Sequence, residues 1–381
     1  MPDSRTPKPH RILFTIPNFI TAGSGQVLVN IAERLDRSRF QPSVCVLKTG
    51  GMLEERIHAH GIPLLELPFA VAPRPLAGLP ARLWRAAGRF RSYHFDLWHS
   101  WHYSDDYTEP LIARLVGARA WIYTKKAMVW GSRAWVVRSL LATRIPAMNT
   151  AMIERFFSHP VLRRKTQLLP PSVNTEEFQP GVPARLAVRQ NLGVGKDEFL
   201  IGCVAHLVAV KGHPTLLRPL AGVPGAHLLL AGRALEEDYV RELHKLCSDL
   251  QIGDRVHFLG ALADVPALHA ELDMFVLPTL GRMRMEGCPV ALLEAMACSL
   301  PCVATDIPGA QDVIEAGISG LLVPPEEPEA LAEAIGSLLQ SAELRRRLGD
   351  AARKRILARY TIEREVADYE ALYSEILNTS T

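Results

Sequence analysis

The feature that most constrains the fold is the alternation, along the whole chain, of short apolar runs with segments of helical spacing. The apolar runs include "RILFTIPNF", "FDLWHSW", "FLIGCVAHL" and "MFVLPT". Continuous runs of this length indicate strands buried on both faces, as in parallel sheets that helices cover on each side. We therefore expect an α/β protein built on parallel sheets.

The chain is long enough for two domains, because 381 residues exceed the usual domain size of about 100 to 200 residues. Prolines cluster in "PPSVNTEEFQPGVPARLAV", and a second series of apolar runs begins after this segment. We expect two Rossmann-like domains over residues 1–180 and 181–360. The last stretch has helical spacing, and no apolar run follows it. Residues 361–381 should form a helix that packs back on the first domain.

Charge and cysteine usage limit the class of protein. The formal net charge of +3 is too small to indicate nucleic-acid binding by itself. It is unevenly distributed, because residues 1–180 hold 24 Lys and Arg against 13 Asp and Glu, whereas residues 181–381 hold 19 against 27. The six cysteines form no CxxC pair, which favours reduced thiols in a cytoplasmic protein. Polar residues, glycines and a proline interrupt the charge-free stretch 12–32, which argues against a membrane span.

The most informative segment is "MEGCPVALLEAMACSLPCVATD". Pro289 suits the first turn of a helix, so we expect the helix to begin near Cys288. Glu294 then falls in its second turn among apolar neighbours, where a buried carboxylate needs a partner. Its two oxygens suit a vicinal diol, such as the ribose of a nucleotide. The alternative is an exposed helix face or an internal salt bridge.

Glu286 lies just ahead of the same helix. An acid at this place can simply favour the positive end of the helix dipole. Alternatively, Glu286 frames a pocket for a sugar and a phosphate together with the backbone amides of Val290 and Ala291 at the helix start.

Two further turns between a strand and a helix are candidate anion sites. Lys211 follows the run "IGCVAHL", and a helix opens at about His213; the alternative is an ordinary surface loop. The segment "NFITAGSGQVLVNIAERL" carries Gly23, Ser24 and Gly25 between the first strand and the first helix, where a ligand can approach the backbone. It lacks the GxGxxG spacing of a dinucleotide site, so a plain tight turn explains it equally well.

On these residues the chain resembles the retaining glycosyltransferases of family 4. Glu286 and Glu294 correspond to that family's E-x7-E motif, inside the block "EGCPVALLEAMACSLPCVATDIPGAQDVI". The segments "LLPPSVNTEEFQP", "HFLGALADVPALHAELDMFVLPT" and "GLLVPPEEPEALAEAI" are similar to other parts of the family's sequence, so the resemblance spans nearly the whole chain. It implies the GT-B fold of two facing Rossmann-like domains.

The resemblance also implies a site. The donor would be a nucleoside-diphosphate sugar, such as a UDP- or GDP-sugar, held mainly by the second domain. Glu294 would bind the ribose hydroxyls, Glu286 the transferred sugar and Lys211 the diphosphate, so that Glu286 and Lys211 carry the catalysis. Residues 23–25 would close over the phosphates or the acceptor. No metal and no cofactor are implied, because cationic side chains and helix N-termini stabilise the leaving diphosphate.

The sequence departs from the family pattern in three places. His206 stands where the family commonly has an arginine ahead of the diphosphate-binding lysine. Lys125 and Lys126 stand near a place where a first-domain histidine often supports the sugar. The loop "TLGRMRMEG" is longer than usual and contains Arg282 and Arg284, which we expect to supply the charge that His206 lacks. The alternative is a basic surface loop.

The first domain carries features that suit an acceptor. Residues 74–93 hold five arginines and no acid, and their spacing predicts a basic amphipathic helix. Such a helix can lie on an anionic membrane surface, or it can simply cover the sheet. His99 and His102 follow a strand, where ligands gather in open sheets, and we group them with Lys125 and Lys126 as candidate acceptor-binding residues.

The sequence therefore predicts a metal-independent retaining glycosyltransferase for cell-envelope polysaccharide or glycolipid synthesis. We expect it in the cytoplasm, on the inner face of the plasma membrane, with a sugar nucleotide and a lipid-linked or polysaccharide acceptor as partners and no nucleic acid. The alternative is a catalytically weak partner subunit that binds the sugar nucleotide. A nucleotide-sugar epimerase is less expected, as is an NAD-dependent oxidoreductase.

Overall fold

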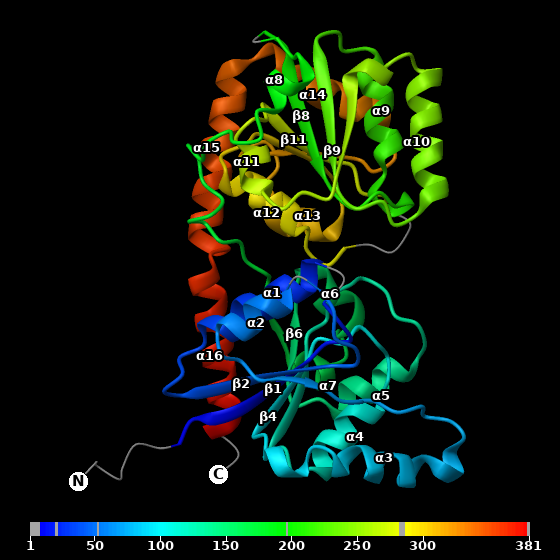
Figure 1. Cartoon of the computed structure of the whole chain (residues 1–381), viewed down its shortest axis with the longest axis vertical. Helices are drawn as coiled ribbons and strands as arrows, with labels where there is room; N and C mark the ends of the chain where they lie inside the picture. Colours follow the sequence, from blue (N-terminus) through cyan, green and yellow to red (C-terminus); the bar gives the residue numbers. More distant parts are fainter. Residues whose placement is uncertain (1–7, 20–21, 52, 196, 282–285, 379–381) are drawn as a thin grey trace, which may run out of the picture. The chain divides into compact units, whose positions relative to one another are not determined.

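The computed structural model describes residues 8–19, 22–51, 53–195, 197–281 and 286–378. The chain forms two compact units, each built around its own parallel sheet (Figure 1). Unit 1 comprises Met1–Pro171 and Ile362–Thr381, and unit 2 comprises Ser172–Thr361. The first division falls before the predicted position near residue 180, because Val173 and Phe178 pack in the core of unit 2.

Unit 1 contains a five-stranded sheet in the order β3-β2-β1-β4-β5 and a two-stranded sheet, β6-β7. Its strands are β1 (His10–Thr15), β2 (Phe40–Val46), β3 (Leu64–Glu66), β4 (Leu97–Ser100), β5 (Ala120–Tyr123), β6 (Ile145–Ala147) and β7 (Thr166–Leu168). Its α-helices are α1 (Ala22–Arg34), α2 (Leu53–Ala59), α3 (Leu79–Gly88), α4 (Thr108–Leu115), α5 (Ala134–Leu141), α6 (Thr150–Phe156), α7 (Pro160–Arg163) and α16 (Ile362–Asn378). Helix α16 returns to unit 1 from the end of the chain and packs beside α1.

Unit 2 contains a six-stranded parallel sheet in the order β10-β9-β8-β11-β12-β13. Its strands are β8 (Phe199–Val204), β9 (Ala226–Ala231), β10 (Val256–Gly260), β11 (Met274–Leu277), β12 (Cys302–Thr305) and β13 (Leu321–Val323). Its α-helices are α8 (Val188–Leu192), α9 (His213–Ala221), α10 (Glu237–Asp249), α11 (Val265–His269), α12 (Val290–Ala297), α13 (Pro308–Val313), α14 (Pro328–Gln340) and α15 (Ala342–Arg359). Short 3₁₀ helices lie at Leu76–Gly78, Arg91–Tyr93, Ala209–Lys211 and Gly253–Arg255.

The sheet of unit 2 is buried on both faces, as the apolar runs predict. Side chains alternate between two separate apolar cores along each strand: Leu200 and Leu229 belong to one core, whereas Ile201 and Leu228 belong to the other. Helices α12 and α15 contribute to the first core, and α9, α10 and α14 contribute to the second. This double burial explains why the strands lack a polar face.

Each sheet reverses its strand order at one place, between β1 and β4 in unit 1 and between β8 and β11 in unit 2. In open α/β sheets the loops that follow two such strands turn to opposite faces, and ligands bind between them at the carboxyl ends of the strands. The two reversals therefore indicate where a site in each unit is expected.

The structure corrects two local predictions. Gly23, Ser24 and Gly25 lie inside the first turn of α1 rather than in a loop before it. Helix α12 begins at Val290, close to the predicted start near Cys288, but Pro289 is its N-cap and not part of its first turn. None of the helices in the described part of the chain combines the length and the apolar character that a membrane span requires.

Candidate functional site

The loops that follow β8 and β11 touch at the reversal point of unit 2. Gly212 ends the loop after β8 with a φ of 67°, and a side-chain carbon added to it would collide with the carbonyl oxygen of Pro278 after β11. The backbone N–H of Leu280 donates to the carbonyl oxygen of Val210 at 2.9 Å. A glycine is needed here because only a residue without Cβ allows both the left-handed φ and this close approach. Lys211 is therefore fixed beside the loop that leads to Glu286.

Lys211 and Glu286 form an ion pair at this place, with the Lys211 Nζ in contact with Glu286 Oε1. Their side chains are only 14% and 23% exposed. Burial lowers the pKa of Lys211 to about 8, so the lysine stays mostly cationic at pH 7. The second carboxylate oxygen of Glu286, Oε2, is buried and has no hydrogen-bond partner among the described residues. The pair thus keeps one strong acceptor available.

The N-terminus of α12 follows Glu286 directly. Its N-cap, Pro289, provides no side-chain hydrogen bond to the first turn. Within the described residues, the N–H groups of Val290 and Ala291 have no acceptor, whereas Leu292 donates to the carbonyl oxygen of Pro289 at 3.0 Å. Two free N–H groups at the positive end of a helix are suited to an anion.

Glu294 lies in the second turn of α12 and is partly exposed. Burial raises the pKa of Glu294 to about 8, and the nearby carboxylate of Glu177 raises it further. At pH 7 this carboxyl group is therefore mostly protonated. No hydrogen bond or ion pair within the described part of the chain joins it to Lys211 or Glu286.

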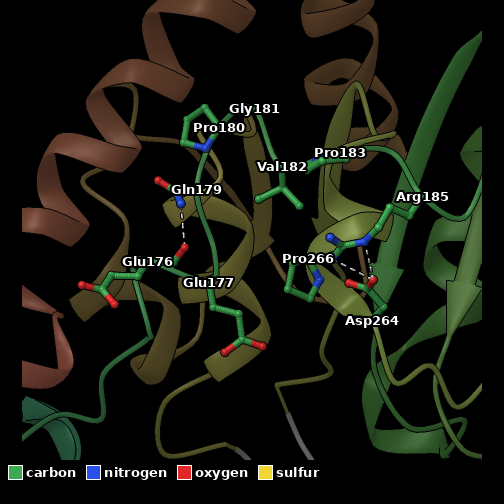
Figure 2. A pocket seen from close by; sticks show the side chains of 10 residues that line it. All are labelled: Glu176, Glu177, Gln179, Pro180, Gly181, Val182, Pro183, Arg185, Asp264 and Pro266. Carbon is green, nitrogen blue, oxygen red and sulfur yellow. Dashed lines mark hydrogen bonds and ion pairs between the residues drawn. The ribbon is translucent and has the colours of Figure 1, made fainter.

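Glu177 also lines an open pocket of about 480 Å³ in unit 2 (Figure 2). The other lining residues are Glu176, Gln179, Pro180, Gly181, Val182, Pro183, Arg185, Asp264 and Pro266. Arg185 and Asp264 close one side with an ion pair of 3.0 Å. Glu177 links the pocket to Glu294, because its carboxylate lies close enough to Glu294 to raise the pKa of that residue. Lys211 and Glu286 do not line the pocket.

His206 follows β8 and is half-buried, with a buried Nδ1 that lacks a hydrogen-bond partner among the described residues. Burial lowers its pKa, and the charges of Lys211 and Arg233 lower it further, so His206 is neutral at pH 7. Arg282 and Arg284, which we expected to replace its missing charge, lie outside the described residues.

At the reversal point of unit 1, Lys126 in the loop after β5 contacts the first turn of α1 and the loop after β4. Its Nζ donates to Ser24 Oγ in α1 at 3.1 Å and to the carbonyl oxygen of Trp101 after β4. Gly23 faces open space, whereas a side-chain carbon on Gly25 would lie 3.0 Å from a leucine side chain of α2. Of the three residues at 23–25, Gly25 therefore serves internal packing.

His99 is a core residue, in contrast to the prediction that it binds an acceptor. It is fully buried, its Nδ1 lies 2.8 Å from the Tyr373 hydroxyl of α16, and its Nε2 lies 2.8 Å from Thr124 Oγ1. Burial lowers the pKa of His99 to about 3, so it is neutral. The strand places this side chain on the face that α16 covers, which leaves both ring nitrogens occupied.

Lys125 is likewise inside unit 1, with 1% of its surface exposed. Its Nζ donates to the carbonyl oxygen of Val129 at 2.7 Å and lies 3.6 Å from the centre of the Trp130 ring. Burial lowers the pKa of Lys125 to about 7, and the positive charge of Arg155 contributes. Lys125 therefore holds the segment after β5 and does not reach a ligand.

His102 and Lys126 remain candidates for acceptor binding. The loop that carries His102 is held by a hydrogen-bond network that the sequence did not reveal. Glu109 and Arg138 form a fully buried ion pair of 3.1 Å. Glu109 also accepts from Ser100 Oγ at 2.7 Å, and Arg138 donates to the carbonyl oxygens of His102 at 3.5 Å and Asp106 at 2.5 Å. No motif or spacing links these two residues, so no local signal could have identified them.

Comparisons with known proteins agree with this architecture. The family model "Glycosyltransferase Family 4" matches residues 21–177, and "Glycosyl transferases group 1" matches residues 185–355. A GDP-mannose-dependent alpha-(1-6)-phosphatidylinositol monomannoside mannosyltransferase of Mycobacterium tuberculosis is 31% identical over 53% of this chain. The chain spans about half the length of that relative, 55%. A D-inositol 3-phosphate glycosyltransferase of Geodermatophilus obscurus is 28% identical over 83% of this chain and 74% of its own length.

Solved structures show the same fold. A glycosyltransferase from Rickettsia africae superposes with a TM-score of 0.85 at 18% identity and covers 97% of this chain and 99% of its own. Anabaena Alr3699/HepE, solved in complex with UDP, gives a TM-score of 0.82 at 22% identity over 96% of this chain and 100% of its own. The two family matches together span both units. The chain therefore belongs to glycosyltransferase family 4 and has the GT-B fold.

Proposed function

We propose that this protein is a retaining, metal-independent glycosyltransferase that moves a sugar from a UDP- or GDP-sugar to an acceptor hydroxyl in cell-envelope polysaccharide or glycolipid synthesis. The observation that carries the proposal is the Lys211–Glu286 pair at the reversal point of unit 2, next to the free amides of α12. The relatives support it, since one is named as GDP-mannose-dependent and Anabaena HepE was solved with UDP.

In the proposed donor complex, the diphosphate lies against Lys211 and the amides of Val290 and Ala291. The free oxygen of Glu286 accepts a hydroxyl of the transferred sugar. The carboxyl group of Glu294 binds the ribose diol, which a protonated carboxyl can do as both donor and acceptor.

The resemblance to family 4 implies the chemistry that we propose. The bond between the anomeric carbon and the diphosphate oxygen breaks, and a new bond to the acceptor oxygen forms on the same face of the sugar. The acceptor proton passes to a phosphate oxygen of the leaving group. Lys211 and the N-terminus of α12 stabilise the negative charge that develops on the diphosphate, which lowers the barrier.

The proposed acceptor residues are His102 and Lys126, and the proposed membrane contact is the segment 74–93. Helix α3 packs its apolar side into unit 1 and leaves Trp84 58% exposed, with Leu76 at 67% nearby. The guanidinium carbon of Arg91 lies 3.9 Å from the centre of the Trp84 ring. An exposed aromatic side chain among arginines suits the interface of an anionic bilayer on the inner face of the plasma membrane.

Flotation with anionic and neutral liposomes tests this membrane contact. Wild-type protein should float with the anionic vesicles at low salt, and Trp84→Ala should reduce that fraction. Equal flotation with both kinds of vesicle would contradict the proposed contact.

Calorimetric titration of UDP and GDP tests the donor site. Wild-type protein should bind at least one of them, and Lys211→Ala should lose that binding. Glu286→Gln should retain the nucleotide but lose sugar transfer. A second candidate is a weakly active partner subunit that only binds the sugar nucleotide, which the neutral His206 favours. Measured transfer or hydrolysis of a sugar nucleotide would exclude it.

A further inference from the structure

The backbone that follows β8 is in direct contact with the backbone that follows β9. The N–H of Leu207 donates to the carbonyl oxygen of Arg233 at 3.0 Å, and Leu207 pairs with Ala234. A side-chain carbon on Gly232 would collide with the carbonyl oxygen of Ala205 and lie 3.0 Å from the amide nitrogen of His206. Gly232 therefore allows the two segments to touch, and this contact brings Arg233 beside His206.

Lys211, His206 and Arg233 lie close together where the backbone after β8 meets the backbone after β9. Of these three side chains, only Arg233 is a cation that is not paired with an anion among the described residues. Lys211 is paired with the carboxylate of Glu286, and His206 is neutral. Arg233 is exposed and has no acidic partner among the described residues. Its charge acts on His206 together with that of Lys211, which indicates that the three groups are close in space.

A donor diphosphate brings about two negative charges to this place. The Lys211–Glu286 pair has no net charge while it is intact, so it compensates little of that charge. A guanidinium group is suited to the task, because it keeps its charge at any physiological pH and presents several N–H donors to phosphate oxygens.

We propose that Arg233 binds the diphosphate of the donor and supplies the fixed positive charge that His206 lacks; this inference rests on the proposed function. Arg233 follows β9, and β9 and β11 lie on opposite sides of β8, so Arg233 and the loop that leads to α12 flank the loop after β8 from opposite sides. Its role is to bind the leaving group, and Glu286 remains the residue that contacts the sugar.

Paired titrations of nucleoside diphosphates and monophosphates test the inference. Because charge-assisted contacts to phosphate contribute about 1.5 to 3 kcal/mol, Arg233→Ala should weaken UDP or GDP binding by about 10- to 100-fold. Binding of UMP or GMP should change less than about 3-fold, because a monophosphate brings less negative charge to Arg233 than a diphosphate does. Arg241→Ala is the matched control, since Arg241 is an exposed arginine of the same unit, paired with Asp238 on α10, and its loss should leave binding unchanged.

A second variant tests whether the charge itself is what matters. Adding His206→Arg to Arg233→Ala should restore most of the lost diphosphate affinity, whereas Arg233→Lys should retain part of it. Wild-type UDP and GDP affinity in Arg233→Ala would overturn the inference. An equal loss of mono- and diphosphate binding, or a loss only in Arg282→Ala/Arg284→Ala, would overturn it as well. If the wild-type protein bound neither UDP nor GDP, both the proposed function and the inference about Arg233 would be wrong.

Discussion

Replacing Glu294 with glutamine should make the protein more stable at pH values above 4.5. Glutamine keeps the size and the hydrogen-bonding capacity of a protonated glutamic acid but cannot ionise. Burial raises the pKa of Glu294 from 4.5 to about 8. At a pH between 4.5 and about 8, the Glu294 carboxyl group is ionised in the unfolded chain and protonated in the folded chain. The wild-type protein therefore loses stability as the pH rises from 4.5 to 8, and Glu294→Gln does not.

The size of the effect follows from the same two values. The difference between 4.5 and about 8 corresponds, at about 1.36 kcal/mol per pKa unit, to a ceiling of about 5 kcal/mol at pH 8 and above. Solvent reaches part of this side chain, so we expect about 2 to 3 kcal/mol at pH 8 and almost none at pH 4.5.

The two units can be followed separately in urea unfolding. All six tryptophans belong to unit 1, so tryptophan fluorescence reports unit 1, whereas far-ultraviolet circular dichroism reports both units. The transition of unit 2 should shift to higher urea in Glu294→Gln at pH 8 and not at pH 4.5. Glu242→Gln, which removes an exposed acid on α10, is the control. A stability difference that does not change with pH would refute the assignment of a protonated Glu294.

Three further substitutions test other parts of the structure. Lys125→Met should stabilise unit 1 by about 2 to 3 kcal/mol at pH 7 and below, because burial lowers the pKa of this lysine from 10.5 to about 7. This gain in stability should disappear as the pH rises toward 10.5. Urea unfolding monitored by tryptophan fluorescence measures the stability of unit 1. Glu109→Gln should destabilise unit 1 by about 3 kcal/mol in the same assay, because it leaves the buried guanidinium of Arg138 without its anion. Glu375→Gln, which breaks the exposed ion pair with Arg144, should cost less than about 1 kcal/mol. Glu286→Gln should bind UDP or GDP several-fold more tightly, because Lys211 is no longer paired, and weaker binding in calorimetry would contradict that competition.

The α/β architecture and the loops that carry Lys211 and Glu286 could be predicted from the sequence, because their signals are local. Buried parallel strands need continuous apolar runs, and a helix needs a recognisable first turn. Lys211 and Glu286 each lie between a strand and a helix, and the reversal of strand order brings two such loops together. Their contact requires a glycine at position 212, because the carbonyl oxygen of Pro278 leaves no room for a side chain there. The sequence does not show this requirement, since Pro278 is far from Gly212 along the chain.

The first-unit candidates were less predictable, because tertiary contacts decide which way a side chain points. His99 and Lys125 lie at the ends of strands, where a ligand site is expected, yet both side chains are buried. The partner of His99 is Tyr373, which is 274 positions away in the sequence. Glu109 and Arg138 are separated by 29 positions and belong to different helices. No periodicity in the sequence encodes pairings of this range.

Three buried polar atoms without hydrogen-bond partners among the described residues lie on the loops that meet at the reversal point of unit 2. His206 Nδ1, Thr279 Oγ1 and Glu286 Oε2 are buried without hydrogen-bond partners among the described residues, and all three follow β8 or β11. Each such group costs about 1 to 3 kcal/mol in a folded protein. A ligand rich in oxygens and hydroxyl groups that satisfied these three atoms, beside a helix N-terminus without a side-chain cap, would stabilise the unit. A sugar bound through a diphosphate offers both kinds of group, so these three atoms are further candidates for contact with the proposed donor.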